Sequence, residues 1–164
     1  MPKFDFFINF ADMNTTHSQV QWLADGVGMP AIDTARLERW IDEVARRHDR
    51  ITGPLTYIFC DDAKIIEVNR QFLSHDYYTD IITFDYTRGR RVSGDMFISL
   101  DTVRSNAELQ GCAYGDELLR VVIHGVLHLC GINDKGPGER EIMESHENEA
   151  LAMLASMDVK TTDR

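Results

Sequence analysis

Apolar residues recur at two spacings along this 164-residue chain, one typical of helices and the other of strands. Apolar positions at i, i+3, i+4 and i+7 predict amphipathic helices, and Asp33 or Thr34 can cap the first of them. Five helices are expected, over about residues 33–48, 62–73, 116–130 and 138–157, with a short one capped by Asp101. The segment 116–130 is apolar on nearly every side, which predicts a helix buried at the centre of a domain.

Segments rich in β-branched and aromatic residues alternate with these helices and predict strands. They lie at about residues 4–10, 55–60, 81–86 and 92–100, and the polar turn between the last two predicts a hairpin. Residues 11–31 are expected to form a loop. Because no linker or repeat interrupts the chain, we expect residues 1–164 to form one α+β domain built around the buried helix.

Composition narrows the class of protein further. The N-terminal apolar stretch is too short and too acidic for a signal peptide, and no apolar run reaches the ~18 residues of a membrane helix, so a soluble cytoplasmic protein is expected. The formal net charge of -10 argues against a protein that coats nucleic acid by bulk electrostatics, so any RNA contact must be local. The three cysteines form no Cys-x-x-Cys pair, which favours a reducing compartment.

Two histidines interrupt the buried helix and provide the candidate chemistry. His124 and His128 are one turn apart, so their side chains share a face and suit one metal ion. Gly131 can end the helix in a left-handed conformation and turn the chain back, which makes Asp134 the best candidate for a third ligand. Three protein ligands leave one position open, as catalytic zinc sites require, so we expect one Zn²⁺ per chain.

Other interpretations of this pattern remain open. A His-x-x-x-His pair also occurs as two hydrogen-bonded core histidines, although a metal would satisfy both buried imidazoles at once. Gly125 stands where helix-borne zinc proteases carry their glutamate base, which disfavours peptide hydrolysis. Gly125 either leaves room for substrate near the ion or allows close helix packing.

Three blocks of sequence carry a resemblance to a known family. They are His-Gly-x-Leu-His-Leu-x-Gly from His124, the stretch from Asn69 to Phe84, and the stretch from Gly94 to Ser99. In their order along the chain they resemble the YbeY family of bacterial single-strand-specific endoribonucleases, which mature and quality-control ribosomal RNA. The resemblance implies a small α+β fold with a mixed sheet and a metal site at the base of a cleft.

The resemblance also implies a substrate and partners. It implies cleavage of single-stranded ribosomal RNA, including maturation of the 3′ end of small-subunit rRNA, and contact with the ribosome or its small subunit. Neither a membrane nor DNA is expected as a partner. Two positions depart from the family pattern: Asp134 replaces a third histidine, and Leu73 replaces an arginine tied to RNA cleavage. Arg70, one turn before Leu73, either compensates or belongs to a solvated face.

The remaining candidate residues have two interpretations each. Asp80 either orients a ligand or activates water beside His124 and His128, or caps a turn, and Asp95 is interpreted in the same way. Arg39 and Arg47 belong to a basic stripe on the first helix that, with Arg90 on the hairpin turn, could hold a phosphate backbone or simply be solvated.

Three other histidines, His17, His75 and His146, are not strong ligand candidates, and His146 is best explained as a core residue.

The leading interpretation is a zinc-dependent endoribonuclease in which His124 and His128 are both metal ligands and catalytic residues. One alternative is a ribosome-associated RNA-binding factor with a mainly structural metal, an interpretation supported by Leu73. Another is a metallohydrolase of a different substrate, because three ligands alone do not distinguish a phosphodiester from an amide.

Overall fold

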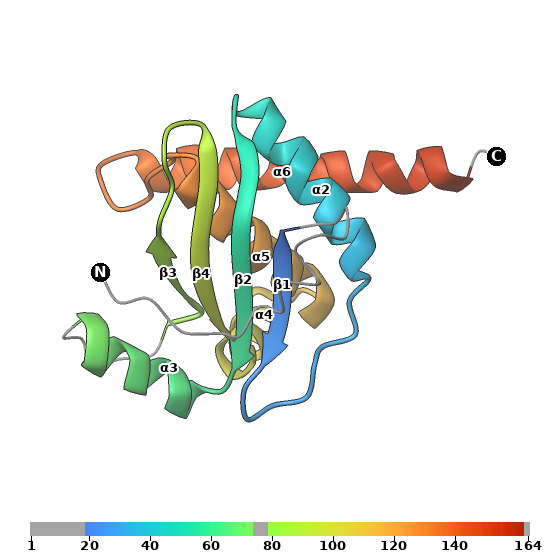
Figure 1. Cartoon of the computed structure of the whole chain (residues 1–164). Coiled ribbons are helices and arrows are strands. Elements are labelled where there is room, and N and C mark those ends of the chain that lie inside the picture. The colour runs from blue at the N-terminus through green and yellow to red at the C-terminus, as the bar shows by residue number, and fades with distance from the viewer. Residues whose placement is uncertain (1–18, 74–78, 163–164) are drawn as a thin grey trace, which may run out of the picture.

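In the computed structural model, which describes residues 19–73 and 79–162, four strands form one mixed sheet (Figure 1). Along the chain they are β1 (Val20–Ala24), β2 (Ile51–Cys60), β3 (Ile81–Asp85) and β4 (Arg91–Ser99), in the order β1-β2-β4-β3. β2 pairs in parallel with β1 and β4, whereas β3 pairs antiparallel with β4 at one edge. The expected hairpin and mixed sheet are confirmed.

The loop expected over residues 11–31 is wrong in part, because it contains β1. β1 pairs residue by residue with β2, from Val20 opposite Leu55 to Ala24 opposite Phe59. Only Val20 of this strand is buried, so its strand conformation depends on pairing with β2 rather than on a local apolar pattern. The strand expected at residues 4–10 lies outside the described residues, as do His17 and His75.

The helices follow the expected order, but the helix expected at residues 62–73 ends in a π-helical turn and the helix after β4 has a different N-terminal cap. They are α2 (Thr34–Arg47), α3 (Asp62–Val68), the π-helical turn η1 (Asn69–Leu73), α4 (Leu100–Gln110), α5 (Tyr114–Leu129) and α6 (Glu139–Thr162). Asp33 and Asp61 cap α2 and α3 with their side chains. The cap expected at Asp101 is wrong, because Ser99 accepts the hydrogen bond from the Thr102 amide and Asp101 lies inside the first turn.

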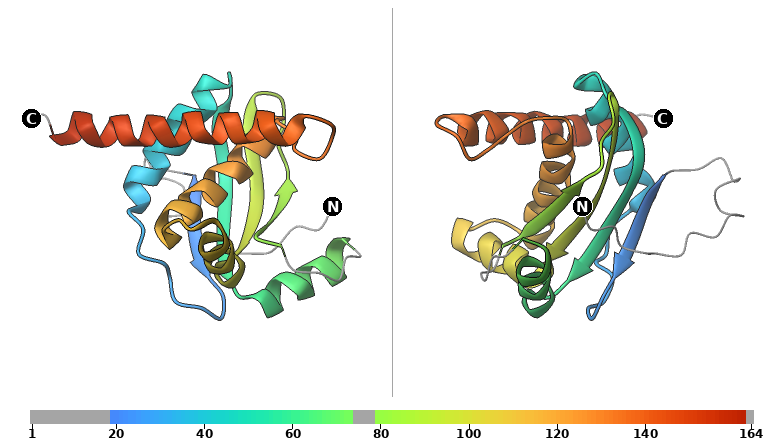
Figure 2. Two further views of the ribbon diagram at one scale, coloured as in Figure 1. Left: turned by 180° about the vertical axis from the view of Figure 1, so that it is seen from behind. Right: turned by 60° about the vertical axis from the view of Figure 1, so that its left-hand side comes forward.

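The sheet separates two apolar clusters. Alternate residues of β2, such as Tyr57 and Phe59, pack with apolar residues of α2, α4, α5 and α6. Ile58 and Cys60 face the opposite side, where they pack with α3. Figure 2 shows α4, α5 and α6 together on one side of the sheet. The Tyr57 hydroxyl donates a 2.8 Å hydrogen bond to the Val122 carbonyl, so the central strand also holds the central helix.

Gly125 allows α5 to pack closely on the sheet. A Cβ atom added there would lie 2.6 Å from Met96 Sδ and 3.0 Å from Ile81 Cδ1, both shorter than ordinary contacts. Of the two interpretations of this glycine, the structure supports close packing. The close approach places the C-terminal half of α5, with its two histidines, directly beside β3.

The described residues contain no helix long and apolar enough to cross a membrane. Cys60 and Cys130 are buried, Cys112 is exposed, and all three are free thiols. Burial raises the pKa of Cys60 to about 12 and that of Cys130 to about 11. The two buried cysteines therefore behave as small apolar core residues.

Candidate metal centre

The C-terminal turn of α5 brings the three expected ligand residues together. Gly131 has a φ of 96°, its amide donates to the His128 carbonyl at 2.9 Å, and the Ile132 amide donates to the Leu127 carbonyl at 3.1 Å. These two bonds form a Schellman motif, in which the chain reverses after a left-handed residue. The expected role of Gly131 is confirmed, and the reversal returns Asp134 to the histidine face of α5.

Asp134 lies between the two imidazole rings. Its Oδ2 atom is 3.3 Å from His124 Nε2 and 3.4 Å from His128 Nε2. The ring centroids are 4.6 Å apart and the rings are nearly perpendicular. All three side chains are partly buried, so the ligand atoms converge in a site that is screened from water without being sealed.

These residues fit a zinc ion. Two atoms bound to one tetrahedral zinc at ~2.0–2.1 Å lie about 3.3–3.4 Å apart, which matches the separations from Asp134 to both imidazole nitrogens. Two nitrogen ligands and one carboxylate are a donor set typical of catalytic zinc. Among residues 19–73 and 79–162, this is the one group of three or more His, Cys, Asp or Glu residues that converges closely enough to hold a metal.

His146 is not part of this group. Its ring contacts that of His48 at 5.0 Å between centroids, where α6 meets the end of α2. His146 Nδ1 is buried, with no hydrogen-bond partner among the described residues. His146 is half-buried, so the structure places it in the packing between α2 and α6 and outside the ligand group.

Glu147 and Arg120 complete the surroundings of His124 and are the main residues that the sequence analysis missed. Glu147, on α6, places Oε2 2.6 Å from His124 Nδ1, and Arg120, on α5, donates to its other oxygen at 2.9 Å. The available signal was Arg120, which precedes His124 by four residues and so shares its helix face. Glu147 carried no local signal, because it lies 23 residues after His124.

The charges around the site shift the pKa values of the two histidines in opposite directions. Burial alone would lower the pKa of His124, but the hydrogen bond and charge of Glu147, with the charges of Asp80 and Asp134, raise it above its ordinary value. Burial, followed by the charge of His124, lowers the pKa of His128. The surrounding carboxylates therefore stabilise a positive charge on His124 more than on His128.

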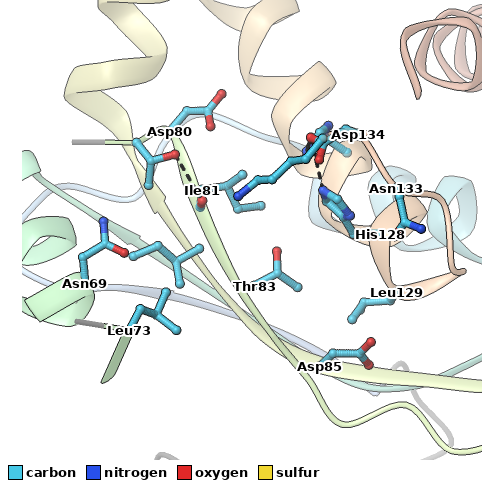
Figure 3. A pocket seen from close by; sticks show the side chains of 14 residues that line it. Asn69, Leu73, Asp80, Ile81, Thr83, Asp85, His128, Leu129, Asn133 and Asp134 are labelled. Atoms are coloured by element: carbon cyan, nitrogen blue, oxygen red, sulfur yellow. Dashed lines mark hydrogen bonds and ion pairs between the residues drawn. The ribbon is translucent and has the colours of Figure 1, made fainter. Parts of the chain in front are cut away.

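A pocket of about 430 Å³ opens beside the ligand group along the edge strand β3. Figure 3 shows Asn69 and Leu73 on one side of it and His128 and Asp134 on the other, with Thr83 on the strand between them. Leu73 is 40% exposed, so an apolar side chain lines the pocket where the resemblance implies an arginine. The pocket thus gives a ligand direct access to the candidate metal site.

Asp80 lies between this pocket and a second one of about 580 Å³ that extends among α4, α5 and α6. Burial raises the pKa of Asp80, and the charge of His124 partly opposes that rise. The structure thus brings Asp80 to the candidate site. Asp95 lies elsewhere: it is buried on β4 and hydrogen-bonds Tyr86, whose pKa rises to about 12 through burial and the Asp95 carboxylate.

None of the four arginines expected to bind RNA lines the pocket along β3. Arg39 is exposed on α2, and Arg47, on the same helix, bonds Glu149 on α6. Arg70 is exposed on η1 next to a pocket residue, and Arg90 bonds Asp49. Among the described residues, the one lysine or arginine that does line this pocket is Lys135, which the sequence analysis did not select.

Comparisons with known proteins identify the family of the chain. A family model described as Endoribonuclease YbeY matches residues 28–155. Proteins named Endoribonuclease YbeY from Bacteroides thetaiotaomicron and Parabacteroides distasonis are 64% and 61% identical over 134 and 135 residues, covering 82% of this chain and 98% and 95% of theirs. The solution structure of TM1509 from Thermotoga maritima matches with a TM-score of 0.56 and 26% identity, covering 84% of this chain and 92% of that one. Because the family model spans most of the sequence and these relatives match over nearly their whole length, the chain belongs to the YbeY family of endoribonucleases.

Proposed function

We propose that this chain is a zinc-dependent endoribonuclease that cleaves single-stranded ribosomal RNA. It would act in the cytoplasm on rRNA maturation, including the 3′ end of small-subunit rRNA, and in ribosome quality control, with the ribosome or its small subunit as partner. The observation that carries the proposal is a three-ligand group, His124, His128 and Asp134, that faces an open pocket in a member of an endoribonuclease family. A closed structural site would normally have four protein ligands.

The ligand residues would bind the metal, and the pocket would bind the RNA. His124, His128 and Asp134 would hold the ion, and bound zinc supplies a Lewis acid for negative charge that develops at a scissile phosphate. The pocket of about 430 Å³ is within the range of pockets that enclose a small-molecule ligand. It suits one nucleotide that has left the base stack, which a single strand provides far more readily than a duplex.

Asp80 and Lys135 are the candidate residues for proton transfer and phosphate contact. Asp80 lies beside His124, and burial raises the pKa of its carboxyl group, so it accepts a proton more readily than an exposed carboxylate. Lys135 follows a ligand residue and lines the same pocket, where its ammonium group can contact a phosphate oxygen. Arg39, Arg47, Arg70 and Arg90 would contact more distant parts of the RNA.

The test is cleavage of one RNA sequence presented as a single strand and as a duplex. We expect zinc-loaded protein to cut the single strand, and His124→Ala to lose that activity while keeping the circular dichroism of the metal-free fold. His48→Ala is the matched control, because His48 lies at the end of α2 and lines neither pocket beside the ligand group. Equal cleavage by wild type and His124→Ala would contradict the proposal.

One observation favours a second function, an RNA-binding factor whose metal is mainly structural. The apolar Leu73 side chain leaves the η1 side of the pocket without the cation that the resemblance implies. In that case the zinc-loaded protein would bind single-stranded RNA without cutting it, and removal of zinc would weaken the fold as much as the binding. Cleavage that depends on His124 would exclude this alternative.

A further inference from the structure

We propose that Glu147, held by Arg120, is a positioning residue that fixes the orientation and tautomer of His124 for metal binding. This role rests on the proposed zinc site and adds to it an element outside the ligand group. Glu147 lies on α6, whereas His124 and Arg120 lie on α5. The inference therefore assigns a function to the packing of these two helices.

The two nitrogens of His124 face different partners. Nε2 lies 3.3 Å from the Asp134 carboxylate, on the side of the ligand group, whereas Nδ1 lies 2.6 Å from Glu147 Oε2. A carboxylate at Nδ1 favours the tautomer that carries its proton there, and the Nε2 lone pair then remains available for a metal. The same contact prevents the ring from rotating away from Asp134.

Glu147 is itself fixed by Arg120. Arg120 Nη1 donates to Glu147 Oε1 at 2.9 Å, and Nη2 donates to Asn148 Oδ1 at 2.8 Å. The Glu147 residue is only 7% exposed, so its ionised form requires a positive partner to offset the cost of burial. Because Arg120 precedes His124 by one helical turn, both groups meet Glu147 from the same face of α5.

This arrangement is specific to His124 and does not make Glu147 a ligand. In the described part of the chain, His128 contacts Asp134 and the His124 ring, and no second carboxylate holds it. One Glu147 oxygen faces the nitrogen of His124 that points away from Asp134, and the other accepts from Arg120. Glu147 is also absent from the group of residues whose ligand atoms converge. It therefore acts on the metal through His124.

The test measures metal affinity in variants that remove the Glu147 contact in steps. Glu147→Gln keeps a hydrogen-bond acceptor for Nδ1 but loses the charge, whereas Glu147→Ala loses both. Since removal of such partners typically weakens metal binding about 10–100-fold, we expect zinc affinity to fall about 10-fold in the Gln variant and towards 100-fold in the Ala variant. Chelator competition gives the dissociation constants, and the absorption bands of the cobalt-substituted protein report ligand geometry.

Glu149→Gln is the matched control, because Glu149 lies two residues later on α6 and bonds Arg47 instead of the site. It should bind zinc with wild-type affinity and leave the cobalt spectrum unchanged. If Glu147→Ala fails to fold, the Gln variant still tests the role, since it preserves shape and an acceptor.

Zinc affinities of the Glu147→Gln and Glu147→Ala variants within about twofold of wild type would overturn the role of Glu147 but not the zinc site, because loss of a carboxylate that orients a metal-bound histidine typically costs about 10–100-fold. Wild-type protein that binds zinc no better than His128→Ala would overturn the proposed zinc site, and the positioning role with it.

Discussion

At the scale of single residues, Asp134 decides the charge and the donor type of the candidate metal site. Its carboxylate reaches both imidazole nitrogens at 3.3 and 3.4 Å, in the position where the resemblance implies a third histidine. We expect Asp134→His to retain zinc, because imidazole is also a zinc ligand, and Asp134→Asn to lose most of its affinity, because a neutral amide binds zinc poorly. Zinc content after dialysis and zinc dissociation constants test the predictions for both variants.

Asp42→Asn is the matched control for the Asp134 variants, because Asp42 is exposed on α2, away from the ligand group. It should bind one zinc per chain, as wild type is expected to do. An Asp134→Asn protein with undiminished zinc would remove Asp134 from the set of ligands and leave the two histidines to bind the ion with other groups.

A second prediction at this scale concerns the contact between His48 and His146. Burial lowers the pKa of His48, the charges of His146 and Arg47 lower it further, and Glu149 opposes them. An unfolded chain therefore binds this proton more readily than the folded one, so the contribution of His48 to stability is lost as the pH falls through the unfolded pKa of about 6.5. Urea unfolding of metal-free protein at pH 7.5 and 5.5 should show a smaller pH dependence in His48→Gln than in wild type.

Asp49→Asn is the control that tests whether the effect belongs to His48, because Asp49 is the next residue in the chain. Asp49 carries an 88% exposed side chain and bonds Arg90, so its replacement should leave the pH dependence close to that of wild type. An equal pH dependence in wild type and His48→Gln would show that other groups cause the acid sensitivity.

At the scale of elements, the end of α5 is the turn on which the ligand group depends. Gly131 adopts a φ of 96°, a conformation that a side chain disfavours, and the Schellman bonds fix where Asp134 returns. We expect Gly131→Ala to lower the free energy of unfolding by about 1 kcal/mol and to weaken zinc binding as well. Urea unfolding and chelator competition measure the two effects.

Gly115, in the first turn of α5, is the control for this substitution. An added Cβ meets nothing within 4 Å there, and its φ lies outside the strained range. Gly115→Ala should therefore leave the free energy of unfolding unchanged or raise it by up to about 1 kcal/mol. It should not change zinc affinity. Equal effects of the two substitutions would mean that the left-handed turn does not position Asp134.

The elements also show what the sequence predicts well and what it does not. Helical periodicity predicts α2, which buries one apolar stripe, and the nearly continuous apolar character of residues 116–130 predicts the buried helix α5. β1 has no such pattern, because pairing with β2 supplies most of its stabilisation. The π-helical turn at Asn69–Leu73 is likewise set by packing, since the apolar spacing there is compatible with a continued α-helix.

The same distinction applies to the site. His124, His128 and Asp134 lie within eleven consecutive residues, so helix periodicity and one glycine turn predict that they converge. Glu147 reaches His124 only because α6 packs across α5, and no local spacing encodes that contact. Local sequence therefore predicts the ligands, and the tertiary fold determines which groups orient them.

At the scale of the whole molecule, an acidic protein must bind a polyanion through a few local cations. The formal net charge is -10, and Asp80, Asp85 and Asp134 all line the pocket along β3, where Lys135 is the one lysine or arginine in the part of the chain that the structure describes. The net negative charge therefore opposes RNA binding, so each lysine or arginine that contacts a phosphate contributes a larger part of the affinity. The position of these cations should decide which part of the RNA each one contacts.

The last prediction separates cations at the pocket from cations on α2. Each phosphate contact with a single strand contributes about 0.7 to the slope of log affinity against log salt concentration. Replacing both Arg39 and Arg47 with Ala should lower this slope by about 1.4 if both contact phosphates, with a small effect on the rate of cleavage of bound RNA.

Lys135→Ala should lower the slope by about 0.7 and also slow cleavage, because its ammonium group lies in the pocket beside the candidate metal site. Arg104→Ala serves as the control, since Arg104 is exposed on α4, outside the stripe, and its guanidinium lies over the Tyr114 ring. Filter binding across a salt series and single-turnover cleavage give the two quantities. An unchanged slope in the Arg39 and Arg47 double variant would assign the stripe on α2 to ordinary solvated surface, and the RNA would then be held mainly at the pocket.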